Sequence, residues 1–301
     1  MLRLPGWVVA VLIVALLAAN SSADVAPPAG PHGVRPPNGS GGVAPHPAGK
    51  KIPGLPSSMG AMGDSISAAV GACMPKGLYL SCKVRSWSTG TAPGMNSHYQ
   101  RILAHNPAIA GRAFNVAELG AHAADLREQA EKLVRRKVDY VTIQIGANDA
   151  CAPDTDSMTS VEDFRRAIDD ALATLYDGLP NARVLIVSIP DVERLWEVGH
   201  RKPFTRAVWR FGECPSLLDR PTSTSKADKD RRRRVGDRVK RYNKELAEAC
   251  AEYDGHCRWD GGKVHRTRFT FDMVHQLEGF HPSTAGQRRL AAVTYPGRFD
   301  W

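Results

Sequence analysis

Ser65 and His281 have the side chains that nucleophilic catalysis uses. Ser65 follows Gly63 and Asp64, and His281 comes three positions after Glu278. A serine hydroxyl reacts only when a base removes its proton, and a nearby carboxylate can orient a histidine for that task. His281 is therefore the best candidate base among the ten histidines. A histidine just before a helix is more often a cap or a packing residue, so the pair needs support from other residues.

Two further glycine-containing turns follow segments that resemble buried strands. Residues 112–117 run into Gly120, and residues 138–145 end in a Gly-Ala-Asn-Asp turn that contains Asn148. A shorter segment, residues 59–62, leads into the turn of the candidate serine. Ligands of an open parallel sheet bind outside the carboxyl ends of its strands. The sequence therefore predicts that these three turns present their polar groups at one edge of a sheet.

Alternating strand and helix patterns predict the elements that position these turns. Residues 138–145 and 183–189 are rich in Val and Ile, as buried parallel strands are. Between them, Thr159 and Glu162 resemble a capping box, apolar residues recur at helical spacing, and Gly178 supplies a stop. This βαβ unit predicts an α/β fold in which helices cover both faces of a parallel sheet.

The order of the turns resembles the four sequence blocks of the SGNH/GDSL hydrolases. Residues 63–65 are similar to the nucleophile block, Gly120 to the glycine block, residues 146–149 to the GxND block and residues 278–281 to the acid-x-x-His block. The resemblance spans residues 59–301. It implies a three-layer α/β/α fold with a central parallel sheet, as in flavodoxin-like proteins.

The resemblance also implies a role for each candidate residue. Ser65 would be the nucleophile, and His281 would be the general base and later the general acid. Glu278 would orient His281. The backbone N–H groups of Ser65 and Gly120 and the side-chain amide of Asn148 would form the oxyanion hole. The resemblance implies no metal ion and no organic cofactor.

Glu278 departs from the family pattern, which usually has aspartate at this position. The extra methylene could alter the hydrogen bond to the histidine and leave the role to a backbone carbonyl or to Asp272. Asp64 and Asp149 are expected to hold turns or cap helices. An α/β-hydrolase is disfavoured because no Gly-x-Ser-x-Gly elbow surrounds Ser65.

Other segments are similar to the phospholipase B-like branch and to secreted bacterial lipases and esterases of this superfamily. They are residues 86–90, residues 96–99 and Cys151 directly after the GxND block. This similarity implies hydrolysis of carboxylic esters, with phospholipids or acyl glycerols as candidate substrates. The alternative is a carbohydrate esterase that removes acetyl groups from polysaccharide, since one site can serve many acyl substrates. A more remote alternative is an inactive extracellular binding module, against which the intact candidate residues argue.

The amino-terminal composition predicts export. Residues 1–23 contain one cation, an apolar run and then small polar residues, as a cleaved signal peptide does. An uncleaved anchor is the weaker interpretation because the apolar run is short for a membrane span. Residues 24–56 are rich in Pro, Gly, Ala and Ser and predict a flexible linker. Residues 57–301 would form the hydrolase domain of a secreted, monomeric protein.

An even set of cysteines in an exported chain predicts disulfides. Six cysteines allow 15 pairings, among which chain order and loop length favour the sequential one. Zinc is the alternative, although neither a CxxC pair nor an HExxH helix occurs. The favoured pairs are Cys73 with Cys82, Cys151 with Cys214, and Cys250 with Cys257.

The net charge of +9 and a run of four arginines, residues 231–234, raise the question of an anionic partner. Val235, Val239, Tyr242 and Leu246 recur at helical spacing, so the run belongs to an amphipathic helix and most of its arginines are expected on a solvated face. Peripheral contact with anionic lipid or wall polymer is the alternative. Nucleic acid is not an expected partner of an exported protein.

The segment of residues 195–226 shows no clear periodicity and contains four large aromatic residues. We interpret it as an insertion near the site that could act as a lid. Its aromatic residues could contact an acyl chain or pack against the scaffold. They are Trp196, Phe204, Trp209 and Phe211.

Overall fold

The computed structural model describes residues 54–73, 80–253 and 255–301. The predicted signal peptide, residues 1–23, and all of the predicted linker except residues 54–56 lie outside this part of the chain. Among the residues that are described, no helix is long and apolar enough to cross a membrane.

Five parallel strands form the central sheet, in the order β2-β1-β3-β4-β5. All four neighbouring pairs are parallel, which confirms the predicted parallel sheet. The first four strands overlap the segments that the sequence pattern predicts, whereas no pattern predicts β5. The strands are β1 (Met59–Gly63), β2 (Ala113–Asn115), β3 (Tyr140–Gln144), β4 (Arg183–Ile186) and β5 (His256–Trp259).

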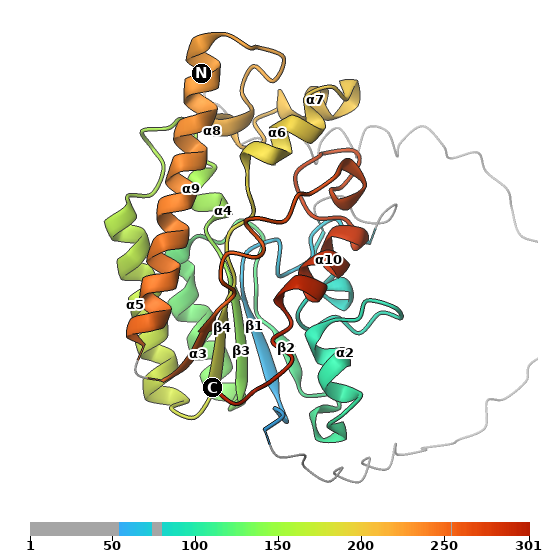
Figure 1. Ribbon diagram of the computed structural model, residues 1–301, viewed down its shortest axis with the longest axis vertical. Coiled ribbons are helices and arrows are strands. Elements are labelled where there is room, and N and C mark those ends of the chain that lie inside the picture. Colours follow the sequence, from blue (N-terminus) through green and yellow to red (C-terminus); the bar gives the residue numbers. More distant parts are fainter. Residues whose placement is uncertain (1–53, 74–79, 254) are drawn as a thin grey trace, which may run out of the picture. The chain divides into compact units, whose positions relative to one another are not determined.

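Helices cover both faces of the sheet, which gives the three-layer α/β/α architecture. Figure 1 shows α3, α5 and α9 on one side of the sheet and α2 and α10 on the other. The helices are α2 (His98–Leu103), α3 (Leu126–Arg136), α4 (Ala147–Ala150), α5 (Val161–Gly178), α6 (Glu193–Gly199), α7 (Pro203–Trp209), α8 (Pro215–Leu218), α9 (Lys226–Glu252) and α10 (Thr284–Thr294). Short 3₁₀ helices are η1 (Lys83–Arg85), η2 (Pro107–Ile109), η3 (Ala123–Asp125) and η4 (Phe271–Met273).

The core lies between the sheet and these helices. Every residue of β3 is buried, because helices exclude water from both faces of the strand. On one side Phe164 and Ile168 of α5 and Leu133 of α3 belong to the same buried cluster as Val141 and Ile143. This burial fixes the strands, and therefore the turns that follow them.

The start of α5 corrects one detail of the sequence prediction. The N-cap is Ser160, whose Oγ accepts a hydrogen bond from the backbone N–H of Asp163 at 3.0 Å. Thr159, predicted to pair with Glu162, instead offers its carbonyl oxygen to the hydroxyl of Tyr242. Both Thr159 and Ser160 have an acidic residue three positions later, so the sequence pattern of a capped helix start fits either one. The contact with α9 decides between them.

The segment of residues 195–226 contains most of α6, all of α7 and α8, and the loops around them. Its aromatic residues divide between the interior and the surface. Trp209 is only 2% exposed, and Trp196 packs under the guanidinium of Arg232, 4.0 Å from the ring centroid. Phe204 and Phe211 are 60% and 49% exposed. Packing therefore explains the two tryptophans and leaves the two phenylalanines without a role in the scaffold.

The arginine run of α9 is only partly solvated, which corrects the expectation for residues 231–234. Arg231 donates to the carbonyl oxygens of Pro215 and Ser216 at the start of α8. Arg232 is 4% exposed and donates to the carbonyl oxygen of Ser223. Residues 233 and 234 are exposed. Half of the run thus fastens the helix to the segment before it.

Three disulfides join the six cysteines in the sequential pairing that chain order favours. Two of them close short loops, and the third spans a separation of 63 residues. The bonds are Cys73–Cys82, Cys151–Cys214 and Cys250–Cys257.

Candidate active site

The turn after β1 carries Ser65 at the carboxyl end of the sheet. Gly63 has a φ of +130°, and a Cβ atom there would lie 1.9 Å from the carbonyl oxygen of Gln144. Only glycine therefore lets β1 end this close to β3. The N–H of Asp64 donates to the same oxygen at 3.3 Å, and Asp64 Oδ1 accepts from the N–H of Ile66 at 2.8 Å. The turn is thus hydrogen-bonded on both sides of Ser65, which is 3% exposed.

The ends of β2 and β3 bring the other two predicted turns to the same edge. The chain after β2 stays beside β1, because the N–H of Glu118 donates to the carbonyl oxygen of the last β1 residue at 3.1 Å. Gly120 follows two residues later with a φ of +80°. Asn148 lies in α4 after β3, and its Nδ2 donates to the carbonyl oxygen of Ala121 at 2.8 Å. Ser65, Gly120 and Asn148 therefore follow three neighbouring strands, with Asn148 bonded to the residue after Gly120.

Asp149 has a structural position beside these turns. Both of its carboxylate oxygens accept from the N–H of Ala123, at 3.3 and 3.1 Å, at the start of η3. His122 lies beside the same carboxylate, and its hydrogen bond to Asp149 raises the pKa of the imidazole. These contacts match the expectation that Asp149 holds local structure.

Glu278 and His281 form a buried, hydrogen-bonded pair. Glu278 Oε1 lies 3.2 Å from His281 Nδ1 and also accepts from the N–H of His281 at 2.8 Å. The two residues are 1% and 4% exposed. The alternative acid, Asp272, is exposed and accepts from the hydroxyl of Thr270. The longer side chain of Glu278 therefore reaches the imidazole despite its extra methylene.

His275 holds the turn that carries this pair, although it is not among the residues that the sequence blocks predict for the site. Its N–H donates to the carbonyl oxygen of His281 at 2.8 Å, and its own carbonyl oxygen accepts from the N–H of Gly279 at 2.7 Å. Its Nδ1 accepts from the N–H of Glu278 at 3.4 Å. His275 lies three residues before Glu278, just as Glu278 lies three residues before His281. This repeated spacing is the feature of the sequence that could have indicated a role for His275.

Helix α7 packs directly against the same turn. Trp209 Nε1 donates to the carbonyl oxygen of Glu278 at 2.7 Å. Gly279 has a φ of +61°, and a Cβ atom there would lie 2.4 Å from Thr205 Cγ2. Glycine is therefore needed for both the conformation and the close approach. The inner face of α7 thus forms one wall around the acid–histidine pair.

Charges around His281 favour the protonated imidazole. Burial by itself lowers the pKa of His281, but the charge and the hydrogen bond of Glu278, together with weaker effects of other carboxylates, raise that pKa above 6.5. The carboxylates of Glu213 and Asp64 act in the same direction. Burial also raises the pKa of Asp64 to about 7.

Helix α10 connects the histidine turn to the nucleophile turn. Ser283 caps the helix, because its Oγ accepts from the N–H of Gly286. One turn later, Gln287 Nε2 donates to the carbonyl oxygen of Ile66 at 2.8 Å, and Gln287 Oε1 accepts from the N–H of Trp87 at 2.9 Å. Gln287 is completely buried. The two turns that bear Ser65 and His281 are therefore fixed relative to each other.

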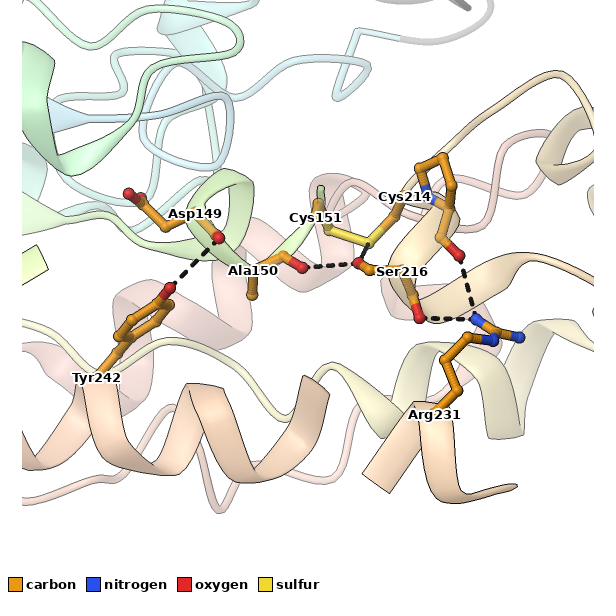
Figure 2. Close-up of a disulfide and its surroundings, with 8 residues drawn as sticks. Asp149, Ala150, Cys151, Cys214, Ser216, Arg231 and Tyr242 are labelled. Atoms are coloured by element: carbon orange, nitrogen blue, oxygen red, sulfur yellow. Dashed lines mark hydrogen bonds between the residues drawn. A yellow bond between two sulfur atoms is a disulfide. The ribbon is translucent and has the colours of Figure 1, made fainter. Parts of the chain in front are cut away.

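The disulfide Cys151–Cys214 joins α4 to the segment that contains α7 and α8. Figure 2 shows the bond and the hydrogen bonds on either side of it. Ser216 Oγ donates to the carbonyl oxygen of Ala150 at 2.7 Å. The hydroxyl of Tyr242 donates to the carbonyl oxygen of Asp149 at 3.3 Å. The carboxyl-terminal end of the short helix that carries Asn148 is thus held by both α9 and the segment that contains α8.

Comparison with known families agrees with this geometry. The sequence profile of the GDSL-like lipases/acylhydrolases matches residues 59–293. The chain belongs to this family. Membership confirms the resemblance that the four sequence blocks indicate, and it makes the chain an ester hydrolase.

The GDSL-family chain is also similar to characterised proteins. It is 30% identical over 182 residues to the membrane-associated phospholipase B1 of Mus musculus, a match that covers 51% of this chain and 12% of that protein. The chain thus spans a small part of the length of this relative.

Two solved structures share its fold. One is a protein of Parabacteroides merdae described as a GDSL-like lipase, with a TM-score of 0.50, 16% identity and coverage of 81% of this chain and 96% of that one. The other is a carbohydrate esterase of family 2 from Corynascus thermopiles, with a TM-score of 0.50, 12% identity and coverage of 85% and 67%.

Proposed function

We propose that this GDSL-family chain is an exported serine esterase that hydrolyses carboxylic esters through an acyl-enzyme on Ser65. One observation carries the proposal: the buried Glu278–His281 pair is fixed, through α10, against the turn that bears Ser65. A base that is oriented by a carboxylate beside a serine is the arrangement that activates a hydroxyl.

In the first step, Ser65 Oγ attacks the ester carbonyl carbon while His281 Nε2 takes the hydroxyl proton. Glu278 accepts the hydrogen bond of His281 Nδ1, which leaves Nε2 as the basic nitrogen and stabilises the imidazolium that forms. The tetrahedral intermediate then expels the alcohol, which takes the proton from His281. The acyl group remains on Ser65.

In the second step, water replaces the alcohol. His281 removes a proton from water as the oxygen attacks the acyl carbon, and the proton passes to Ser65 Oγ when the carboxylic acid leaves. The products are one alcohol and one acid for each ester and water consumed, and the enzyme returns to its starting state.

The oxyanion of both intermediates would be held by three donors. They are the N–H groups of Ser65 and Gly120 and the amide of Asn148. An amide nitrogen carries two hydrogens, so the bond from Asn148 to the carbonyl of Ala121 orients the side chain and leaves a second hydrogen for the oxyanion. Donors fixed in advance act mainly on the charge that develops in the transition state.

Phospholipids or acyl glycerols are the proposed substrates, on the support of the similarity to a phospholipase B1. Export is supported by the predicted signal peptide and by three disulfides, which persist in oxidising compartments.

Covalent labelling tests the nucleophile. A fluorophosphonate should add its mass to the wild-type chain and to Ser67→Ala, but not to Ser65→Ala. Ser67 is a matched control because it lies in the same turn and is completely buried. Equal labelling of wild type and Ser65→Ala would show that the nucleophile lies elsewhere.

A substrate panel tests the ester class. Purified enzyme should hydrolyse long-chain phospholipid or acyl glycerol at least as efficiently as p-nitrophenyl acetate. Activity on acetylated xylan with no activity on long acyl chains would replace the lipid esterase with a carbohydrate esterase.

A further inference from the structure

Helix α7 presents an apolar stripe to solvent. Phe204, Ala207 and Phe211 are exposed and Val208 is half-buried. Phe204, Ala207 and Val208 occupy positions i, i+3 and i+4 of α7 and so share one side of the helix, and Phe211 follows two residues after the helix ends. The apolar stripe of a helix in a globular protein normally faces the core. Here the outward stripe has no partner within the described part of the chain.

The opposite side of α7 is anchored, so the stripe is not a consequence of loose packing. Thr205 and Trp209 are buried, and the indole N–H of Trp209 is bonded to the carbonyl of Glu278. Figure 1 shows α6 and α7 (yellow) beyond the end of the sheet, outside the helices that cover its two faces. The exposed phenylalanines therefore lie on a firm support next to the catalytic turn.

Cations without acidic partners surround the stripe. Arg201, Lys202, Arg206 and Arg210 lie within ten residues, and the sequence has no Asp or Glu between Glu197 and Glu213. Among the described residues, none of these four side chains forms an ion pair. Lys202 lies over the ring of Phe271, and Arg206 donates to the carbonyl oxygen of His200. Their charge is available to an anionic surface.

A cavity of about 440 Å³ opens beside the end of α7. Arg210 and Thr222 line it together with Arg220, which forms ion pairs with Asp219 and Asp228. Guanidinium groups bind phosphate well because their N–H groups match its oxygens. Arg210, for which no ion pair is found within the described part of the chain, is thus placed to contact a phosphate headgroup at the border of the apolar stripe.

We propose that residues 201–211 form a docking face for an anionic phospholipid surface, with Phe204 and Phe211 inserting between acyl chains and the four cations contacting phosphate headgroups. Apolar residues flanked by Lys and Arg are the features of helices that lie in a membrane interface. Docking there would place the lipid beside the turn of Glu278. That this position supplies substrate to the site rests on the proposed esterase function. The binding of residues 201–211 to the lipid surface does not depend on it.

Vesicle co-sedimentation tests the apolar part of this face. The full chain should bind phosphatidylglycerol/phosphatidylcholine vesicles at least about tenfold more tightly than pure phosphatidylcholine vesicles. Phe204→Ser combined with Phe211→Ser should weaken binding by roughly tenfold or more. Tyr176→Ser is the matched control, because Tyr176 is a 42% exposed aromatic residue on α5, and it should bind like wild type.

Charge variants test the electrostatic part. Arg201→Gln combined with Arg210→Gln should weaken binding by about 25-fold at low salt, about fivefold for each cation, with a smaller effect in 0.5 M NaCl. Arg233→Gln combined with Arg234→Gln removes the same charge from α9 and should weaken binding far less. Equal losses in the two double variants would show that only net charge matters and would overturn the docking face.

Two further outcomes would also overturn it. One is unchanged vesicle binding by the phenylalanine variant when its melting temperature equals that of wild type. The other is a dimer in sedimentation velocity that the phenylalanine variant dissociates, because the stripe would then bind a second copy of the chain. Ser65→Ala should bind vesicles like wild type. A wild type that binds but hydrolyses no ester would refute the esterase and leave the docking face standing.

Discussion

The turns at the carboxyl edge of the sheet and the segment from α6 to α8 lie against each other but are built in opposite ways. The turns are buried, and backbone and side-chain hydrogen bonds fix the residues around Ser65, Asn148 and His281. The segment consists of short helices that expose Phe204 and Phe211. Fixed polar geometry suits chemistry, because donors must be aligned before charge develops. Exposed apolar and cationic groups suit contact with a surface.

Two basic regions sharpen the same contrast. In α9 half of the cations form ion pairs with carboxylates one turn away, such as Lys226 with Asp230 and Lys240 with Asp237. None of the four cations in residues 201–210 forms an ion pair with another described residue. The density of arginine in a sequence is thus a poor guide to where positive charge is available, since pairing removes it locally.

Loss of the disulfide that links the two regions should have the largest effect on stability. Cys151→Ser combined with Cys214→Ser should lower the free energy of unfolding by about 4 kcal/mol, because the bond restricts a long loop of the unfolded chain. Cys250→Ser combined with Cys257→Ser opens a much shorter loop and should cost about 2 kcal/mol. Urea unfolding measures both. Equal losses would contradict loop closure as the cause.

Removal of the Asn148 amide should affect turnover and leave vesicle binding intact. Asn148→Ala should lower kcat by about 100- to 1,000-fold with little change in KM, since the bond strengthens mainly in the transition state. Asn148→Asp keeps the size of the side chain but lacks the donor, and should lose as much. Steady-state kinetics on a soluble ester give both values. An active Asn148→Asp would exclude the amide as an oxyanion donor.

Loss of the Glu278 carboxylate should change the pH profile as well as the rate. Glu278→Gln should lower kcat roughly 100-fold. The carboxylate raises the pKa of His281. In the proposed mechanism the neutral imidazole is the base. Without the carboxylate that pKa falls, so the acidic limb of the kcat/KM profile should move to lower pH. Glu278→Asp should keep an acidic limb closer to that of wild type. An unmoved limb in Glu278→Gln would leave the orienting role to another group.

The smallest effects are expected in the arginine run of α9. Arg233→Gln and Arg234→Gln should each change the free energy of unfolding by less than about 0.5 kcal/mol, because these side chains are exposed. Arg232→Gln should cost about 1 to 2 kcal/mol, since it loses the stacking on Trp196 and the bond to Ser223. Thermal unfolding compares the three. A large loss in Arg233→Gln would break the distinction between the buried and the exposed arginines.

Local patterns were sufficient wherever the physical cause is local or periodic. Alternating Val- and Ile-rich strands and capped helices predicted the parallel sheet, and strand-end turns placed Ser65, Gly120 and Asn148 at one edge because parallel strands all end there. The spacing of Glu278 and His281 brought the two side chains together within one turn. β5 was missed because none of its four residues is buried and they form no apolar run.

The sequence by itself determined the fold class, the family and the residues at the sheet edge, since hydrophobic periodicity and glycine-containing turns act over a few residues. Only the tertiary structure decided which arginines are neutralised, which aromatic residues are buried and that Trp209 supports the turn of Glu278. Each of these depends on partners far away in the chain. Burial and ion pairing depend on which segments the folded chain brings together, and a short segment of sequence does not specify them.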